Sequence, residues 1–189
     1  MLGPDDPLPG RPHRVLIAGG SGSGKTTLAQ RVSSALSLPH TELDSLFHGP
    51  GWTVRETFLA DAQQIIDQPR WVSEWQYGAV RARFAERADL MVWLDLPRRT
   101  VMTQVIRRTV RRRIRRQQLW NENLEGPLWT FFTNREHVIR WAWQSHPGIG
   151  PKVIAVRNQR PGLPIVRLTS RAEVERWCGG ALSTVKPIS

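Results

Sequence analysis

Short apolar runs alternate with amphipathic segments along most of this chain. Runs rich in β-branched or large apolar residues are typical of buried strands, and they lie at residues 15–18, 41–43, 71–73, 90–94 and 165–168. Between them, apolar residues recur at helical spacing and predict helices over 24–37, 56–68, 79–87, 98–117 and 128–144. Residues 146–151 read as a turn, and Ser170 with Glu173 reads as the capping box of a last helix. The alternation predicts an α/β protein with a mainly parallel sheet.

The length of 189 residues predicts one domain, which we place at residues 13–178. Residues 1–12 are proline-rich and predict a disordered tail without the features of a secretory leader, and residues 179–189 predict a C-terminal tail. No apolar run approaches the roughly 20 residues of a membrane span. The single cysteine, Cys178, excludes an internal disulfide and a multi-cysteine zinc site. These features favour a cytoplasmic protein that does not contact the membrane.

A glycine-rich segment follows the first predicted strand and opens the first predicted helix. It fits the pattern G-x-x-x-x-G-K-[ST] and comprises Gly19, Gly20, Ser21, Gly22, Ser23, Gly24, Lys25 and Thr26, with Thr27 continuing the helix. Glycines let backbone N–H groups surround a phosphate, and the helix N-terminus adds partial positive charge. In this pattern the lysine reaches the β- and γ-phosphates and the hydroxyl of Thr26 binds Mg²⁺. The segment therefore predicts a site for nucleotide phosphates.

Three of the predicted strands end at an acidic residue: Asp44, Glu74 and Asp95. Ligands of open α/β sheets bind at the carboxyl ends of the strands. Mg²⁺ beside a phosphate loop needs a carboxylate there, usually reached through water. The pattern makes all three acids candidates and does not choose among them.

Positive charge is concentrated in one predicted helix. The formal net charge is +11, but nine arginines lie between Arg98 and Arg116 with no acid among them, and the rest of the chain carries only +2. Such a cluster binds phosphate, either on a nucleotide or on a nucleic acid. Apolar residues spaced by four predict the face of this helix that packs on the protein: Met102, Ile106, Val110 and Ile114.

The order of these motifs resembles that of P-loop kinases of small molecules. It is most similar to a group of small bacterial P-loop proteins described as topology-modulation or adenylate-kinase-like proteins. The resemblance covers residues 13–178 and is carried, after the phosphate loop, by residues 39–46, by Pro50-Gly51-Trp52, by Glu74 and Tyr77, and by residues 88–97 with the arginine-rich helix after them.

The resemblance implies a P-loop NTPase fold with a five-stranded parallel sheet in the order 2-3-1-4-5. It also implies ATP and Mg²⁺ as cofactors and an arginine-bearing lid at about residues 107–127. Asp44 would lie in the acceptor pocket as acceptor ligand or general base, and Glu74 would lie near Mg²⁺, with Asp95 as the reserve metal ligand. The family pattern Asp-Gly-Asn-Tyr reads Glu74-Trp75-Gln76-Tyr77 here, so we expect Trp75 to fill space that an acceptor would use.

These observations predict an ATP-dependent kinase that phosphorylates a small molecule, in the first instance a nucleoside or nucleotide. The predicted catalytic residues are Lys25, Asp44 and two lid arginines four apart on one helix face, Arg108 and Arg112. The alternative is a nucleotide-binding regulatory protein that binds nucleic acid through the arginine-rich helix, which makes nucleic acid the second choice of partner.

Overall fold

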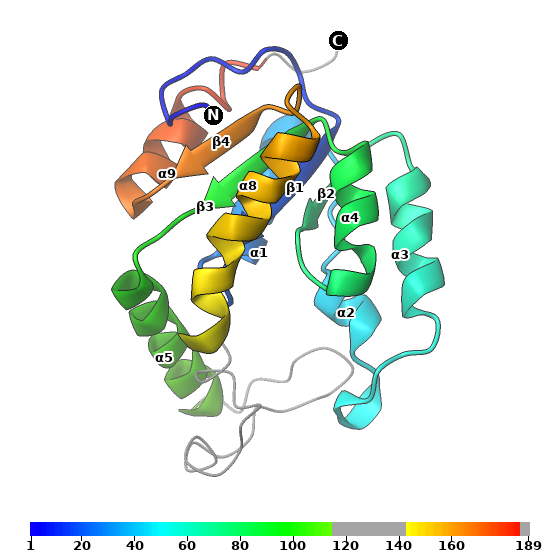
Figure 1. Ribbon diagram of the computed structural model, residues 1–189. Helices are drawn as coiled ribbons and strands as arrows, with labels where there is room; N and C mark the ends of the chain where they lie inside the picture. Colours follow the sequence, from blue (N-terminus) through cyan, green and yellow to red (C-terminus); the bar gives the residue numbers. More distant parts are fainter. Residues whose placement is uncertain (115–142, 186–189) are drawn as a thin grey trace.

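The computed structural model describes residues 1–114 and 143–185. Its centre is a four-stranded parallel sheet in the order β2-β1-β3-β4 (Figure 1). The strands are β1 (Arg14–Gly19), β2 (Trp71–Glu74), β3 (Leu90–Leu94) and β4 (Ile165–Leu168). Nearly all strand residues are buried, as expected for a parallel sheet that is covered by helices on both faces.

Helices connect the strands and cover the sheet. The α-helices are α1 (Lys25–Leu36), α2 (Leu43–Phe47), α3 (Phe58–Asp67), α4 (Gly78–Arg87), α5 (Arg98–Ile114), α8 (Ile149–Gln159) and α9 (Arg171–Gly179). In the ranges that the structure describes, two short 3₁₀ helices, η1 (Pro50–Trp52) and η3 (His146–Gly148), lie in the connections. Within the described ranges no helix has both the length and the apolar character needed to cross a bilayer.

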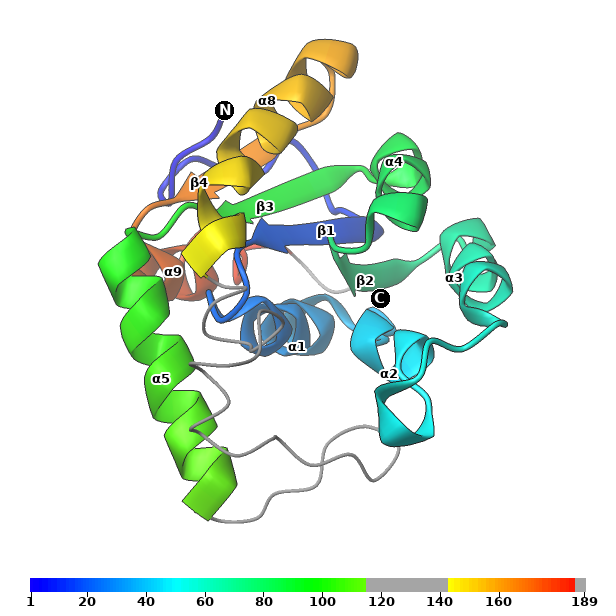
Figure 2. The same ribbon diagram turned by 60° about the horizontal axis from the view of Figure 1, so that its bottom comes forward.

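Successive residues of β1 point to opposite faces of the sheet and belong to two different hydrophobic cores. Val15 and Ile17 of β1 pack with residues of α1 and α9, whereas Leu16 and Ala18 pack with residues of α3, α4 and α8. Figure 2 shows α1 and α9 on one side of the sheet and α4 and α8 on the other. This three-layer arrangement brings the carboxyl ends of β1 and β2 together at one edge, where the phosphate loop lies.

The strands predicted at residues 15–18, 71–73, 90–94 and 165–168 are confirmed, but the strand predicted at 41–43 is wrong. Here the chain makes a single parallel bridge, between His40 and Val72, and α2 then begins at Leu43. Leu43 is buried in the core on the α3 and α4 side, so its apolar character serves helix packing and not a strand. The expected five-strand count and order are therefore not confirmed.

The turn predicted at residues 146–151 is also wrong, because η3 and the start of α8 lie there. Pro147 and Pro151 both fall in the first turn of a helix, where the missing N–H of proline costs nothing. The helix predicted at 128–144 lies almost entirely outside the described residues, as does the lid beyond residue 114.

The apolar face predicted for α5 is displaced by one residue. Val101, Val105 and Thr109 are the buried positions, while Ile106 is 45% exposed. The predicted face, which begins at Met102, and the buried face, which begins at Val101, both have residues spaced by four. Periodicity alone could therefore not decide which of the two faces is buried. The buried face is the one that contacts the phosphate loop, through Val105.

The first residues of the chain, expected to be a disordered tail, lie along β4. Leu2 N–H donates to the carbonyl of Ile165 at 2.8 Å, and its carbonyl accepts from Arg167 N–H at 2.9 Å. This places Leu2 as a one-residue extension at the edge of the sheet. The division into a domain at 13–178 and two tails stays a prediction.

Candidate active site

The phosphate loop joins β1 to α1 and depends on glycine geometry. Gly22 and Gly24 have φ of 78° and 98°, in the left-handed region that favours glycine. A Cβ on Gly22 would lie 2.1 Å from Cγ2 of Val105 in α5. The loop is thus packed directly against α5, and the observed conformation suits the cradle that nucleotide phosphates require.

Replacing Gly22 with alanine is expected to destabilise the protein and to weaken ATP binding. The methyl group must displace Val105, and the residue must hold a strained φ, which together cost about 2–4 kcal/mol. Thermal unfolding and equilibrium binding of ATP measure the two effects. Gly162→Ala is the matched control, because a Cβ there meets no atom within 4 Å. Unchanged binding and stability in Gly22→Ala would contradict the observed loop conformation.

Lys25 is the first residue of α1 and lies half-buried over the loop. Its Nζ donates to the carbonyl of Gly20 at 3.2 Å. Burial lowers the pKa of Lys25, while the negative charges of Glu74 and Asp44 oppose this shift. The charges of two acids thus favour the protonated form of the lysine that would contact the transferred phosphoryl group.

Thr26 and Glu74 form the pair that the sequence predicted for Mg²⁺. The Thr26 hydroxyl donates to Oε1 of Glu74 at 2.7 Å, and Glu74 is only 3% exposed at the end of β2. Burial raises the pKa of Glu74, opposed by the charge of Lys25 and by the Thr26 hydrogen bond. A hydroxyl and a carboxylate are suitable hard oxygen ligands for Mg²⁺. In the described part of the chain no three His, Cys, Asp or Glu side chains cluster as a metal site.

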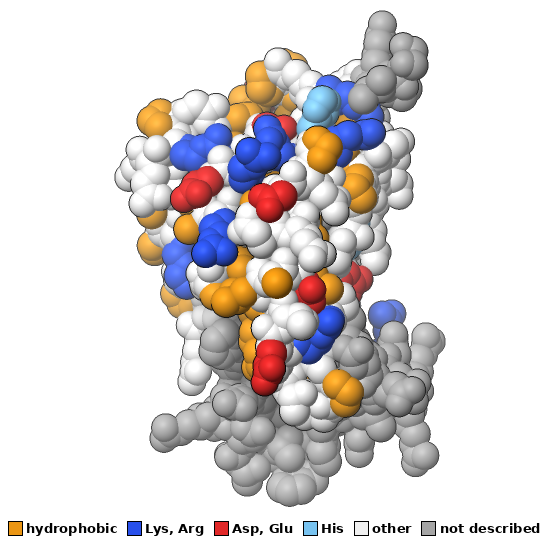
Figure 3. All heavy atoms as spheres, turned by 90° about the vertical axis from the view of Figure 1, so that its right-hand side faces the viewer, with side chains coloured by type: hydrophobic (Ala, Val, Ile, Leu, Met, Phe, Trp, Pro, Cys, Tyr) orange, Lys and Arg blue, Asp and Glu red, His pale blue; other side chains and the backbone are white. Residues whose placement is uncertain are grey.

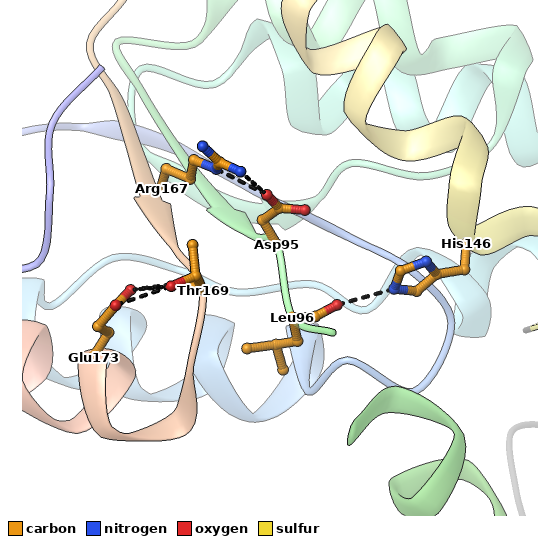
Figure 4. A network of polar contacts seen from close by, with 6 residues as sticks. All are labelled: Asp95, Leu96, His146, Arg167, Thr169 and Glu173. Atoms are coloured by element: carbon orange, nitrogen blue, oxygen red, sulfur yellow. Dashed lines mark hydrogen bonds and ion pairs between the residues drawn. The ribbon is translucent and has the colours of Figure 1, made fainter. Parts of the chain in front are cut away.

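Asp95, the reserve metal ligand, is engaged elsewhere. Its Oδ2 accepts hydrogen bonds from Nε and Nη2 of Arg167, on β4, at 2.8 and 2.5 Å (Figure 4). An ion pair of this kind neutralises the carboxylate at the end of β3. The geometry therefore favours Glu74 over Asp95 as the acid beside the phosphate loop.

His146 is a residue of this region that the sequence prediction missed. Its Nε2 lies 3.0 Å from the carbonyl of Leu96 (Figure 4), and a Cβ on Gly20 would lie 3.5 Å from its Cδ2. The imidazole thus lies between the phosphate loop and the segment that leads into α5. The sequence predicts this residue only as part of a turn, and no local pattern marks it as functional.

Asp44 is the second residue of α2 and is held by residues that follow β2. Its Oδ1 accepts hydrogen bonds from Nε2 of Gln76 at 2.8 Å and from the hydroxyl of Tyr77 at 2.5 Å. That hydroxyl also lies 3.4 Å from Nε2 of His48, whose pKa is lowered by burial and raised by the charge of Asp44, with burial the larger effect. Asp44 thus lies in a small polar network within electrostatic reach of Lys25 and Glu74.

The charges of two arginines from different helices act on Lys25. The charges of Arg108, on α5, and Arg81, on α4, both lower the pKa of Lys25. Arg108 was predicted as a lid residue, and α5 runs past the loop and α1 (Figure 2). The side chain of Arg112, the second predicted lid arginine, lies outside the described part of the chain. Arg81 was not predicted, because a single arginine in an ordinary helix carries no signal.

Trp75, which we expected to fill acceptor space, packs as a core residue. It is 3% exposed and belongs to the core on the α3 and α4 side. Its indole N–H donates to the carbonyl of Arg81 at 3.0 Å, and the guanidinium of Arg81 lies 5.1 Å from the centre of its ring. Burial lowers the pKa of Arg81.

On the face formed by α3 and α4 the charged surface is mixed in sign (Figure 3). Figure 3 shows basic and acidic side chains interspersed over the face formed by α3 and α4. This agrees with the sequence, in which the excess of positive charge is confined to residues 98–116.

No protein-family model and no curated protein sequence matches this chain. Among solved structures, a gluconokinase from Sinorhizobium meliloti 1021 is similar with a TM-score of 0.50 and 15% identity, over 93% of this chain and 95% of that chain. A shikimate kinase from Bacteroides thetaiotaomicron has a TM-score of 0.47 and 16% identity, over 89% and 95% of the two chains. A sugar kinase from Janibacter sp. HTCC2649 has a TM-score of 0.48 and 18% identity, over 94% and 99%.

The chain therefore has an α/β fold of the P-loop kinase type, with a parallel sheet of four strands and flanking helices. This agrees with the predicted class of P-loop protein. The narrower resemblance to topology-modulation proteins is not confirmed by these comparisons.

Proposed function

We propose that this protein is an ATP-dependent phosphotransferase that transfers the γ-phosphoryl group of ATP to a hydroxyl group of a small molecule. The observation that carries the proposal is that a site for nucleotide phosphates and a carboxylate suited to bind an acceptor lie next to each other. Lys25 and Thr26 belong to the phosphate loop, and the hydroxyl of Thr26 donates to Glu74 at the end of β2. Asp44 is hydrogen-bonded to Gln76 and Tyr77, two and three residues after Glu74. Its charge acts on both Lys25 and Glu74. A carboxylate held beside nucleotide phosphates is placed to receive an acceptor.

Each residue then has a definite task in the transfer. Asp44 accepts the proton of the acceptor hydroxyl as the hydroxyl oxygen bonds to the γ-phosphorus. The bond from that phosphorus to the bridging oxygen breaks, and ADP leaves with its electron pair. Lys25 and Arg108 stabilise negative charge on the transferred group. Thr26 and Glu74 are the residues that would hold Mg²⁺, which would supply positive charge against the phosphates of ATP.

Within this class we infer a nucleoside or nucleotide acceptor, on the strength of the sequence resemblance. An aromatic surface beside Asp44 supports this choice: Trp52 is 42% exposed and lies edge-on to His48 with 5.1 Å between ring centres. Aromatic faces of this kind stack nucleobases. The nucleic-acid alternative is not favoured, because the charge of Arg108 acts at the phosphate loop.

Replacing the two acids should separate metal binding from acceptor chemistry. Asp44→Asn removes the base and is expected to lower turnover about 10²-fold with little change in ATP affinity. Glu74→Gln removes the metal-linked carboxylate and is expected to weaken the apparent Mg²⁺ affinity about tenfold or more. Turnover measured as a function of Mg²⁺ concentration, together with equilibrium binding of ATP, distinguishes the two effects.

Glu86→Gln is the control for this pair, since Glu86 lies exposed on α4. It should change neither quantity. If Asp44→Asn shifts the Mg²⁺ dependence and Glu74→Gln does not, the two roles are reversed. If neither variant affects turnover, the proposed function is wrong.

A further inference from the structure

The side chains of Tyr77 and Gln76 converge on one oxygen of Asp44. Both donate to Oδ1, at 2.5 and 2.8 Å. From the residues that the structure describes, no hydrogen bond to Oδ2 is observed. A carboxylate that receives two donors on one oxygen has its plane fixed, and its second oxygen can still accept from another donor.

The backbone of Tyr77 is held in an unusual conformation. Its φ is 58° and its ψ is 108°, and it connects β2 to α4 as the residue before Gly78. The carbonyl of Tyr77 accepts from the N–H groups of Val80 and Arg81 at 3.2 and 3.1 Å, which fixes it to the first turn of α4. Positive φ is uncommon for a bulky residue, and such conformations concentrate at functional sites.

Packing explains why an aromatic ring occupies position 77, but it does not explain why the ring carries a hydroxyl group. The ring stacks on Phe47 with centroids 4.1 Å apart, and it meets Phe58 at an angle with centroids 5.1 Å apart. A phenylalanine would keep both contacts. Burial, followed by the charge of Asp44, raises the pKa of Tyr77, so its hydroxyl keeps its proton and acts as a donor.

We propose that Tyr77 is a positioning residue for phosphoryl transfer, assisted by Gln76. The two donors orient the carboxylate of Asp44 so that Oδ2 faces the hydroxyl of the acceptor. Neither residue touches the reacting atoms, and each acts through Asp44. This inference rests on the proposed function, because it assigns a purpose to the orientation of the acceptor base.

Tyr77→Phe tests the proposal because it keeps the ring and removes only the donor. Turnover is expected to fall about tenfold, the effect of losing one hydrogen bond to a charged group, while the affinity for a non-hydrolysable ATP analogue stays the same. Gln76→Met should change turnover in the same direction. Gln64→Met, at an exposed position of α3, is the matched control and should have no effect.

The decisive measurement is a double-variant cycle with Asp44→Asn. If Tyr77 acts through Asp44, adding Tyr77→Phe to Asp44→Asn should change turnover by less than about twofold. An equal loss in both backgrounds, a loss of ATP affinity in Tyr77→Phe or unchanged turnover in that variant would overturn the positioning role and leave the proposed function standing. Unchanged turnover in Asp44→Asn itself would overturn both proposals.

Discussion

Replacing Lys25 with alanine is expected to lower ATP turnover by about 10³-fold or more and to leave the fold intact. The lysine is placed to stabilise charge on the transferred phosphoryl group, and a contribution of this kind is worth several kcal/mol, about 4 in this case. In the structure Nζ donates to the carbonyl of Gly20, and the charges of Glu74 and Asp44 oppose the lowering of the pKa of Lys25 by burial. Steady-state turnover measures the effect, and thermal unfolding checks the fold.

Lys152→Ala is the control for this variant, because Lys152 lies exposed on α8. Its turnover should match that of the parent protein. Turnover that survives in Lys25→Ala, with the fold preserved, would refute the kinase proposal.

Replacing Arg108 with alanine is expected to reduce turnover by about 10³-fold, because an arginine beside the transferred group stabilises its equatorial oxygens. Arg107 is the matched control: it is the preceding residue of α5 and is exposed. Arg107→Ala should therefore reduce turnover little. Both variants carry the same change in net charge, so the comparison isolates the position of the arginine.

The same two variants test the nucleic-acid alternative. If α5 served to bind nucleic acid, both substitutions would weaken oligonucleotide binding about equally, because each would remove one phosphate contact. Binding through many phosphates would also weaken about 10³–10⁵-fold between about 50 and 200 mM salt. Equal losses of oligonucleotide affinity, with turnover unchanged in both variants, would favour the alternative.

Much of the sheet could be predicted from the sequence because its strands are buried on both faces. Runs such as Val15 to Ala18 have to be apolar throughout, so composition alone locates them. The same rule failed at Leu43, since a short apolar run fits a buried helix as well as a strand. For α5 the spacing by four was correct, but contact with the phosphate loop decided which face is buried.

The candidate site was predictable where a motif of adjacent residues or the carboxyl end of a predicted strand marks its residues. The phosphate loop is such a motif, and the structure brings Thr26 next to Glu74, as the sequence suggested. The contact between Asp44 and Tyr77 joins residues 33 positions apart and depends on a positive φ that no local rule assigns to tyrosine. The placements of Arg81 and His146 likewise follow from tertiary packing.

The central claim is that this protein phosphorylates a hydroxyl group held at Asp44. The most direct measurement is transfer of label from γ-labelled ATP to a panel of small hydroxyl compounds, nucleosides and nucleotides included, by the parent protein and by Asp44→Asn. We predict a labelled product with the parent protein and about 10²-fold slower formation of that product with Asp44→Asn, while both bind ATP equally. A labelled product formed equally by both proteins, or no labelled product with any compound, would contradict the claim.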